Sequence, residues 1–305
     1  MADDPLTGFV RTLLGSGAPV LVLSPPLDDA VLSCGALLGW AGRRARVTVA
    51  TLFTEAGPPP YTLAARQYLK RTRADDAAAL FAERRAEDRR VLGALGVARL
   101  HVGLVDGLFR RLPRARAGTE RLARLLPELD HVYPTNRLHL SRGRVSAHDA
   151  ESLRAVEETV DALLPGSSGA LVLAPPAVGG HADHVLVRTA AERSGRRVVH
   201  PSDFPYDRRA AADARFTDRH RLVARVGERD LDRKAELIRG YRTQADVLFP
   251  DGRVPRAPEV YLLPGADTGA WTGTGAAGGG ARTAAARRVR GRVPARGART
   301  AGRVR

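Results

Sequence analysis

A chain of 305 residues is long enough to bury a substantial hydrophobic core, either as one large α/β domain or as two small ones. Its single cysteine, Cys34, excludes an intramolecular disulfide framework and favours a reducing, cytoplasmic location. No apolar run is long enough for a membrane span, and the first residues include Asp3 and Asp4 in place of a basic leader, so we expect neither a span nor a secretory signal.

The net charge of +16 raises the question of nucleic-acid binding, but half of that charge lies in one segment. Residues 265–305 hold nine arginines and one acidic residue, Asp267, which gives a net charge of +8. The segment is otherwise rich in Gly, Ala and Thr, so we expect a disordered basic tail after a domain of residues 1–264. Its single aromatic residue is Trp271, so specific nucleic-acid binding is not expected and any contact should be non-specific and salt-sensitive.

Periodicity along the body of the chain predicts alternating strands and helices. This alternation indicates βαβ units with right-handed crossovers, and hence a single α/β domain with a Rossmann-like, mostly parallel sheet flanked by helices. The predicted strands are 20–23, 47–53, 99–104, 171–174, 197–200 and 222–226. The predicted helices are 5–17, 28–44, 74–95, 119–129, 149–164, 182–193 and 230–249.

Two of the predicted strands end in polar clusters. The first strand ends in two prolines followed by Asp28 and Asp29, and the fourth is followed by two prolines and then by His181 and His184. In an open parallel sheet, ligands bind beyond the carboxyl ends of the strands where the strand order reverses, so we expect these four side chains to face one another. Carboxylates and imidazoles without a nearby cysteine suit a hard or borderline cation such as zinc.

Each cluster also has a simpler explanation. Asp28 and Asp29 at the start of a helix fit an ordinary helix cap with a favourable dipole contact. A pair of histidines three residues apart, such as His181 and His184, is more often incidental than metal-binding. The combination of both clusters, joined by βαβ units, is much more specific than either one.

The whole pattern resembles that of the PIG-L/LmbE-like zinc-dependent N-deacetylases, over about residues 18–263. The family's first motif is Pro-His-x-Asp-Asp at a strand end, and its second is His-x-Asp-His. The matching residues are Pro25, Asp28 and Asp29 with the helix start 30–35, and then His181, Asp183 and His184.

The resemblance implies an enzyme that removes an acyl group from an N-acetylated sugar or glycoconjugate. By resemblance, Asp29 and His184 are zinc ligands, Asp28 is the base that activates water, and His181 stabilises the oxyanion. The family's first zinc-binding histidine, however, falls at Pro26, which has no donor atom. We therefore expect weakened Zn²⁺ binding and an impaired enzyme, the alternative being a catalytically silent relative that acts as a binding or regulatory protein.

Two further residues are candidates for substrate binding. In the predicted helix 74–95, Arg84 falls inside an apolar arc together with Asp88. Arg84 either pairs with Asp88 and reaches water, or points into the site as the family's Arg-x-x-Glu pattern, matched by Arg84 and Glu87, implies. Asp106 follows the third strand; by resemblance it contacts sugar hydroxyls, and an Asx turn before Gly107 is an equal alternative.

Three other histidines, His131, His139 and His148, show no ligand-like spacing and are expected on the surface. The sequence does not specify an oligomeric state.

Overall fold

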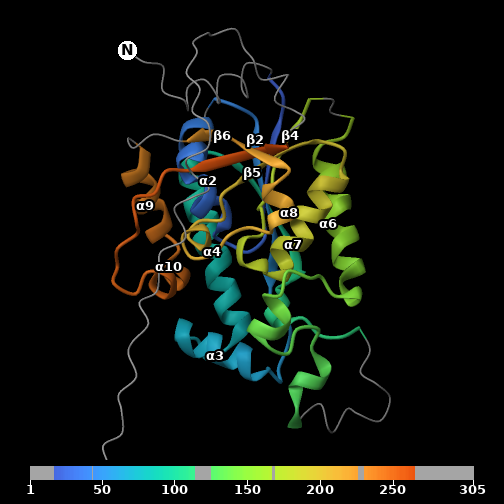
Figure 1. Cartoon of the computed structure of the whole chain (residues 1–305). Helices are drawn as coiled ribbons and strands as arrows, with labels where there is room; N and C mark the ends of the chain where they lie inside the picture. Colours follow the sequence, from blue (N-terminus) through green and yellow to red (C-terminus); the bar gives the residue numbers. More distant parts are fainter. Residues whose placement is uncertain (1–16, 43, 114–124, 167–168, 226–229, 265–305) are drawn as a thin grey trace, which may run out of the picture. The chain divides into compact units, whose positions relative to one another are not determined.

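The computed structural model describes residues 17–42, 44–113, 125–166, 169–225 and 230–264 (Figure 1). They contain a seven-stranded sheet in the order β3-β2-β1-β4-β5-β7-β6. Strands β1 to β5 pair in parallel, whereas β7 is antiparallel to both β5 and β6, so the predicted mostly parallel α/β fold is confirmed. The strands are β1 (Val20–Ser24), β2 (Val47–Glu55), β3 (Ala98–Val105), β4 (Leu171–Leu173), β5 (Arg197–Pro201), β6 (His220–Arg225) and β7 (Val260–Pro264).

Helices cover both faces of the sheet. The described helices are α2 (Asp29–Ala41), α3 (Leu63–Thr72), α4 (Ala77–Leu95), α6 (Ala150–Leu163), α7 (Ala182–Arg193), α8 (Ala214–Thr217), α9 (Leu231–Arg239) and α10 (Arg242–Leu248). Short helical turns join them, among them η1 (Gly107–Phe109), η2 (Pro127–Asp130) and η3 (Asn136–Leu140). None of the described helices combines the length and the hydropathy needed to cross a membrane.

The two faces of the sheet bury two separate hydrophobic clusters, because successive residues of a strand point to opposite sides. Val20 and Val22 of β1 pack with residues of α2, α4 and α9, whereas Leu21 and Leu23 pack with residues of α6 and α7 (Figure 1). All five residues of β1 are buried, as expected for the centre of a parallel sheet covered on both sides.

Strand order reverses at β1, which has β2 on one side and β4 on the other. The register of β1 against β4 pairs Val20 with Leu171 and Val22 with Leu173, in parallel. The carboxyl ends of β1 and β4 therefore lie next to each other, and the segments that follow them begin at the same edge of the sheet. This is the switch point at which α/β sheets bind ligands.

A third hydrophobic cluster closes this edge of the sheet. It centres on Phe109, whose ring makes edge contacts with Tyr61 at 5.6 Å, Phe81 at 5.7 Å and Tyr68 at 6.2 Å between centroids. Tyr68 belongs to α3, a helix with no counterpart among the predicted elements. Its start is marked by Thr62, whose side chain accepts a hydrogen bond from the Ala65 N–H.

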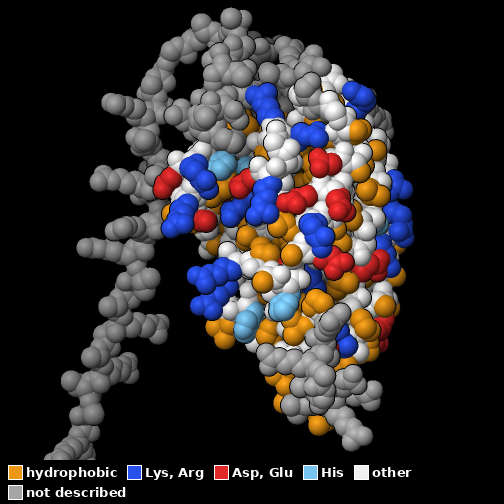
Figure 2. All heavy atoms as spheres, turned by 90° about the vertical axis from the view of Figure 1, so that its right-hand side faces the viewer, with side chains coloured by type: hydrophobic (Ala, Val, Ile, Leu, Met, Phe, Trp, Pro, Cys, Tyr) orange, Lys and Arg blue, Asp and Glu red, His pale blue; other side chains and the backbone are white. Residues whose placement is uncertain are grey.

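The face of the molecule covered by α6 carries mixed charges (Figure 2). Arg193 lies 3.4 Å from Glu157, and Arg196 lies 3.3 Å from Asp161. Because both signs alternate there, this face does not present the continuous basic surface that nucleic-acid binding requires. The predicted basic tail, 265–305, lies outside the described residues.

The structure corrects several further predictions. The single helix predicted over 230–249 is two helices, α9 and α10, because the chain turns at Gly240 to pack on α4; a Cβ at Gly240 would lie 2.6 Å from Val91 Cγ2. Strand β7 was not predicted, and it pairs between β5 and β6. His131 is buried, with its Nδ1 2.7 Å from the Pro127 carbonyl, whereas His139 and His148 are exposed as expected.

Two predicted helices fall largely where the structure gives no description. Residues 5–16 of the first and 119–124 of the second lie outside the described residues. In the rest of the second prediction Leu125 is helical, whereas Pro127–Asp130 form η2, a short 3₁₀ turn in place of the predicted α-helix.

A buried ion pair joins the C-terminal part of the chain to α2. Lys234 Nζ lies 2.9 Å from Glu259 Oε1, and both side chains are at most 5% exposed. The Glu259 carboxylate also accepts hydrogen bonds from the backbone N–H groups of Ala36 and Leu37, just after a non-helical residue, Cys34, inside α2. Glu259 therefore caps the second half of the helix whose first residue is Asp29.

Replacing Glu259 with alanine would leave the Lys234 ammonium buried without its counter-ion and two amides of α2 without an acceptor. We expect the free energy of unfolding to fall by about 3–5 kcal/mol, measured by urea denaturation. Glu236→Ala, at an exposed position of α9, is the control and should change it by less than about 0.5 kcal/mol. Equal losses in the two variants would contradict this role of Glu259.

Candidate active site

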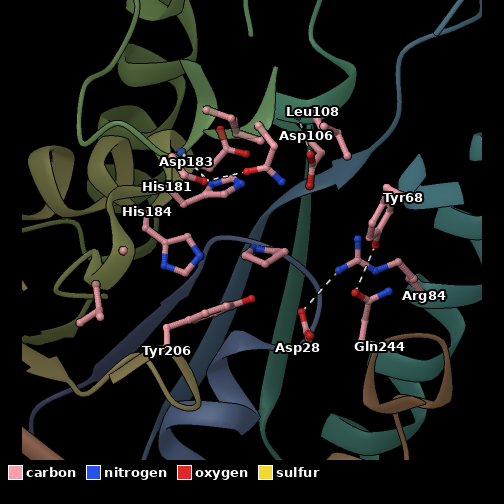
Figure 3. Close-up of a pocket in the computed structure, with 16 residues that line it drawn as sticks. Asp28, Tyr68, Arg84, Asp106, Leu108, His181, Asp183, His184, Tyr206 and Gln244 are labelled. Atoms are coloured by element: carbon pink, nitrogen blue, oxygen red, sulfur yellow. Dashed lines mark hydrogen bonds and ion pairs between the residues drawn. The ribbon is translucent and has the colours of Figure 1, made fainter. Parts of the chain in front are cut away.

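A cavity of about 290 Å³ lies beyond the carboxyl ends of β1 and β4 (Figure 3). Segments after four strands, β1, β3, β4 and β5, and residues of α3, α4, α7 and α10 contribute to its walls. The lining residues are Pro26, Asp28, Tyr68, Arg84, Asp106, Leu108, Asn136, Leu140, Ser141, Val178, Gly179, His181, Asp183, His184, Tyr206 and Gln244. The predicted meeting of the two distant polar clusters is therefore confirmed.

Asp28 occupies the cap position of α2, but its side chain makes no capping hydrogen bond. The ordinary-cap explanation is therefore wrong for this residue. Its Oδ1 lies instead 3.4 Å from Arg84 Nη2, and both side chains are buried. Burial raises the pKa of Asp28 to about 7, even though the Arg84 charge opposes the rise.

Arg84 points into the cavity and is 3% exposed, so the alternative in which it reaches water is wrong (Figure 3). Its guanidinium lies 4.9 Å from the centroid of the Phe81 ring. Beside it, the Tyr68 hydroxyl donates to Gln244 Oε1 at 3.1 Å. Glu87, the second residue of the family's pattern, faces away and accepts hydrogen bonds from Thr243.

His184 lies between two carboxylates. Its Nε2 is 2.9 Å from Asp29 Oδ2, and its Nδ1 is 3.5 Å from Asp203 Oδ1. Burial lowers the pKa of His184, but Asp29 and Asp203 outweigh this and hold the pKa well above its usual value. Asp203 was not predicted as a site residue; the signal for it was its position just past β5, in the segment that ends at Tyr206.

Asp29 and His184 have the donor atoms of a cation site. Asp29 Oδ2 is buried, and its 2.9 Å separation from His184 Nε2 is near the ~3.3 Å expected between two ligands of a tetrahedral zinc ion. Asp203 beside His184 Nδ1 matches the carboxylate that orients metal-binding histidines. Among the described residues, however, no third His, Cys, Asp or Glu donor lies within 4.8 Å of both atoms. The residues present fit a metal ion with two protein ligands and not three.

His181 occupies the cap position of α7 and lines the cavity beside His184, with ring centroids 5.4 Å apart. Its Nδ1 accepts a hydrogen bond from the Asp183 N–H at 3.3 Å. Burial lowers the pKa of His181, which favours the neutral ring. The proton of the neutral ring is then on Nε2, the nitrogen available to donate a hydrogen bond.

A buried arginine that sequence reasoning missed holds α7 in place. Arg110 Nη2 lies 2.5 Å from Asp183 Oδ1 and Nη1 lies 2.9 Å from Asp149 Oδ1. The other oxygen of Asp183 accepts the Gly107 N–H at 2.8 Å. Nothing near Arg110 in the sequence signals this role, because both of its carboxylate partners are distant in the chain.

Asp106 lines the cavity, and its Oδ1 accepts the Leu108 N–H at 2.9 Å. The Asx-turn alternative is therefore confirmed, and the same turn places the carboxylate at the cavity wall. The turn also brings Gly107 against Asp183.

Comparison with known proteins identifies the family. Residues 21–194 match the PIG-L family, described as GlcNAc-PI de-N-acetylase. The chain belongs to this family. It is 33% identical over 222 residues to the 2'-N-acetylparomamine deacetylase of Streptomyces fradiae, a match that covers 71% of this chain and 67% of the relative.

Solved structures of other deacetylases share the fold of this PIG-L family protein. The zinc-inhibited form of teicoplanin deacetylase Orf2 has a TM-score of 0.60 at 25% identity, covering 82% of this chain and 100% of that one. The A40926 pseudoaglycone deacetylase Dbv21 has a TM-score of 0.58 at 25% identity, covering 81% and 96%. The family and these relatives support a hydrolytic N-deacetylase.

Gly107 provides a test of the packing behind the cavity. A Cβ at this position would lie 2.8 Å from Leu140 Cδ1 and 3.0 Å from Asp183 Oδ1, so Gly107→Ala should lower the free energy of unfolding by about 1–3 kcal/mol. In Gly93→Ala, the control in α4, the nearest atom is 3.8 Å away, and we expect a gain of about 0.5–1 kcal/mol. Urea denaturation measures both, and a stabilising Gly107→Ala would contradict the close approach.

Proposed function

We propose that the protein hydrolyses the N-acyl group, most simply an acetyl group, of an amino sugar in a small-molecule glycoconjugate. The family match supports the reaction type. The relatives support the substrate class, because they are named for N-acetylparomamine, teicoplanin and the A40926 pseudoaglycone. The cytoplasmic location and the identity of the sugar as N-acetylglucosamine remain predictions from the sequence.

The observation that carries this proposal is the convergence of the β1 and β4 strand ends on one cavity. Asp28 from the first end and His181 from the second line the same space, together with Asp106 and with Arg84, which lies beside Asp28 (Figure 3). Amide hydrolysis needs a base for water, a donor for the oxyanion and groups that hold the substrate. The cavity offers residues for each of these.

Asp28 is the proposed general base. Its carboxylate takes a proton from water as the water oxygen attacks the acyl carbon, and it returns that proton to the nitrogen when the C–N bond breaks. A carboxyl group with a pKa near 7 can both accept and donate a proton at neutral pH. Arg84 fixes the carboxylate from one side.

His181 is the proposed donor to the oxyanion. Because its Nδ1 accepts a hydrogen bond from the Asp183 backbone, the neutral ring carries its proton on Nε2. That N–H can donate to the carbonyl oxygen as negative charge develops there. Asp183 and Arg110 hold the start of α7 and thereby position the ring.

Asp29 and His184 would hold a metal ion, and we propose that they do so weakly. A bound Zn²⁺ supplies positive charge that polarises the acyl carbonyl and lowers the pKa of water. Catalytic zinc sites usually have three protein ligands, and Pro26 occupies the position of the third ligand in this chain. Impaired metal affinity follows from the missing donor.

The cavity suggests how much of the substrate is enclosed. A volume of about 290 Å³ lies at the lower end of the range for small-molecule sites. It suits one sugar ring with its acyl group, so a larger scaffold would stay outside. Arg84, Asp106 and Gln244 are the proposed partners of the sugar hydroxyls.

Pro26 also favours a second candidate, a relative that binds its ligand without catalysis. Binding without catalysis would use the same cavity and the same sugar-binding residues, but it would need neither a metal ion nor Asp28 as a base. The two candidates differ in their response to substitutions at Asp28 and Pro26.

Asp28→Asn removes the proposed base while keeping the size of the side chain. We expect acetate release from 2'-N-acetylparomamine or an N-acetylglucosaminyl compound to fall by about 10²–10⁴-fold, measured by a coupled acetate assay. Asp75→Asn, at an exposed position before α4, is the control and should keep full activity. An Asp28→Asn protein as active as the wild type would exclude this mechanism.

Pro26→His restores a donor at the missing ligand position. We expect zinc affinity, measured by equilibrium dialysis and elemental analysis, to rise at least about tenfold and acetate release to increase with it. Pro26→Ala removes the proline ring without adding a donor and should change neither. If Pro26→His and Pro26→Ala bind zinc equally, the lost-ligand explanation is wrong; if Pro26→His alone is active, the natural protein is the silent relative.

A further inference from the structure

A second group of possible metal ligands lies away from the cavity. It consists of Glu192 in the last turn of α7, His200 in β5 and His220 at the start of β6. One ligand atom from each of the three lies within 4.8 Å of the other two, and within the described part of the chain no other such set of three occurs. Three separate elements therefore bring metal-binding side chains to one point.

The hydrogen bonds of both histidines leave the same nitrogen available. His200 Nδ1 lies 2.9 Å from the Ala174 carbonyl, and His220 Nδ1 lies 2.6 Å from the Phe216 carbonyl. A carbonyl oxygen can only accept, so each Nδ1 carries the proton and each neutral ring has its lone pair on Nε2. This is the tautomer and the backbone support found for metal-binding histidines.

His200 has a buried nitrogen without a partner. The residue is 0% exposed, and its Nε2 makes no hydrogen bond. Burial, together with the neighbouring His220, lowers the pKa of His200 to about 3, so its ring is neutral at physiological pH. A buried acceptor left unsatisfied costs free energy, which a bound cation would recover.

The rings are held in place by Phe216. The His220 ring stacks on Phe216 with centroids 3.8 Å apart, and the His200 ring meets Phe216 edge-on at 4.9 Å. A positively charged side chain, Arg188, lies nearby, with its Nε 4.0 Å from Glu192 Oε1. The Arg188 guanidinium lies over the Phe216 ring and donates a hydrogen bond to the Pro176 carbonyl, and its pairing with Glu192 offsets its charge beside the site.

We propose that Glu192, His200 and His220 form a second cation site, with Zn²⁺ as the fitting ion. Two imidazoles and one carboxylate are a zinc donor set, and a water molecule would complete the tetrahedron because Glu192 is exposed. The site is distinct from Asp29 and His184: residues 184 and 192 are eight residues apart on α7, about 12 Å along its axis. A cation here links α7 and β6 to β5.

The test uses the full-length protein, stripped of metal by a chelator and titrated with zinc chloride. Bound zinc is measured by equilibrium dialysis with elemental analysis, and the melting temperature is followed in parallel. We expect Asp29→Asn, which removes a donor of the other site, to keep a bound zinc ion and a zinc-dependent rise in melting temperature.

In the Asp29→Asn background, Glu192→Gln and His220→Gln should each lower the remaining zinc affinity at least tenfold and abolish the rise in melting temperature. Glu192 is exposed, so its substitution leaves folding intact, and Glu236→Gln on α9 is the matched control that should bind zinc normally. Two results would overturn the proposal: no zinc bound by Asp29→Asn, or equal affinity in all of these variants.

Discussion

The pairing of β1 with β4 is the constraint on which the rest of the site depends. These two strands are far apart in sequence, yet they lie side by side in parallel, with Val22 opposite Leu173. Parallel neighbours end at the same edge, so the aspartates after β1 and the histidines after β4 meet there. A shift of register by one residue would move the buried side chains of β1 to the opposite faces, and the two hydrophobic clusters oppose that shift.

Buried ion pairs fix the two helices that begin at this edge. Glu259 and Lys234 hold the broken middle of α2, and Arg110 holds the start of α7 through Asp183. Such pairs contribute little net stability compared with apolar packing, but losing one partner is costly. Their effect is to give Asp28 and His181 defined positions, as the proposed roles of base and oxyanion donor require.

Pro26 has no donor atom, but the polar side chains around it keep their contacts with one another. Asp29, His184 and Asp203 still form a continuous line of carboxylate, imidazole and carboxylate. Arg84 still holds Asp28. The proposed loss of a ligand therefore concerns one position, and the side chains around it keep these contacts. The opposite end of α7 meanwhile carries a separate group of donors that belongs to no part of the cavity.

The parallel α/β fold, the two polar strand ends and their meeting at one edge could all be predicted from the amino-acid sequence, and so could the absence of a donor atom at Pro26. These follow from local periodicity and from one topological rule about parallel sheets. Three features became evident from the folded chain alone: Arg84 turns toward Asp28, Arg110 binds Asp183 73 residues away, and the last predicted helix breaks at Gly240. Periodicity acts over a few residues, whereas these contacts join segments whose proximity depends on how whole elements pack.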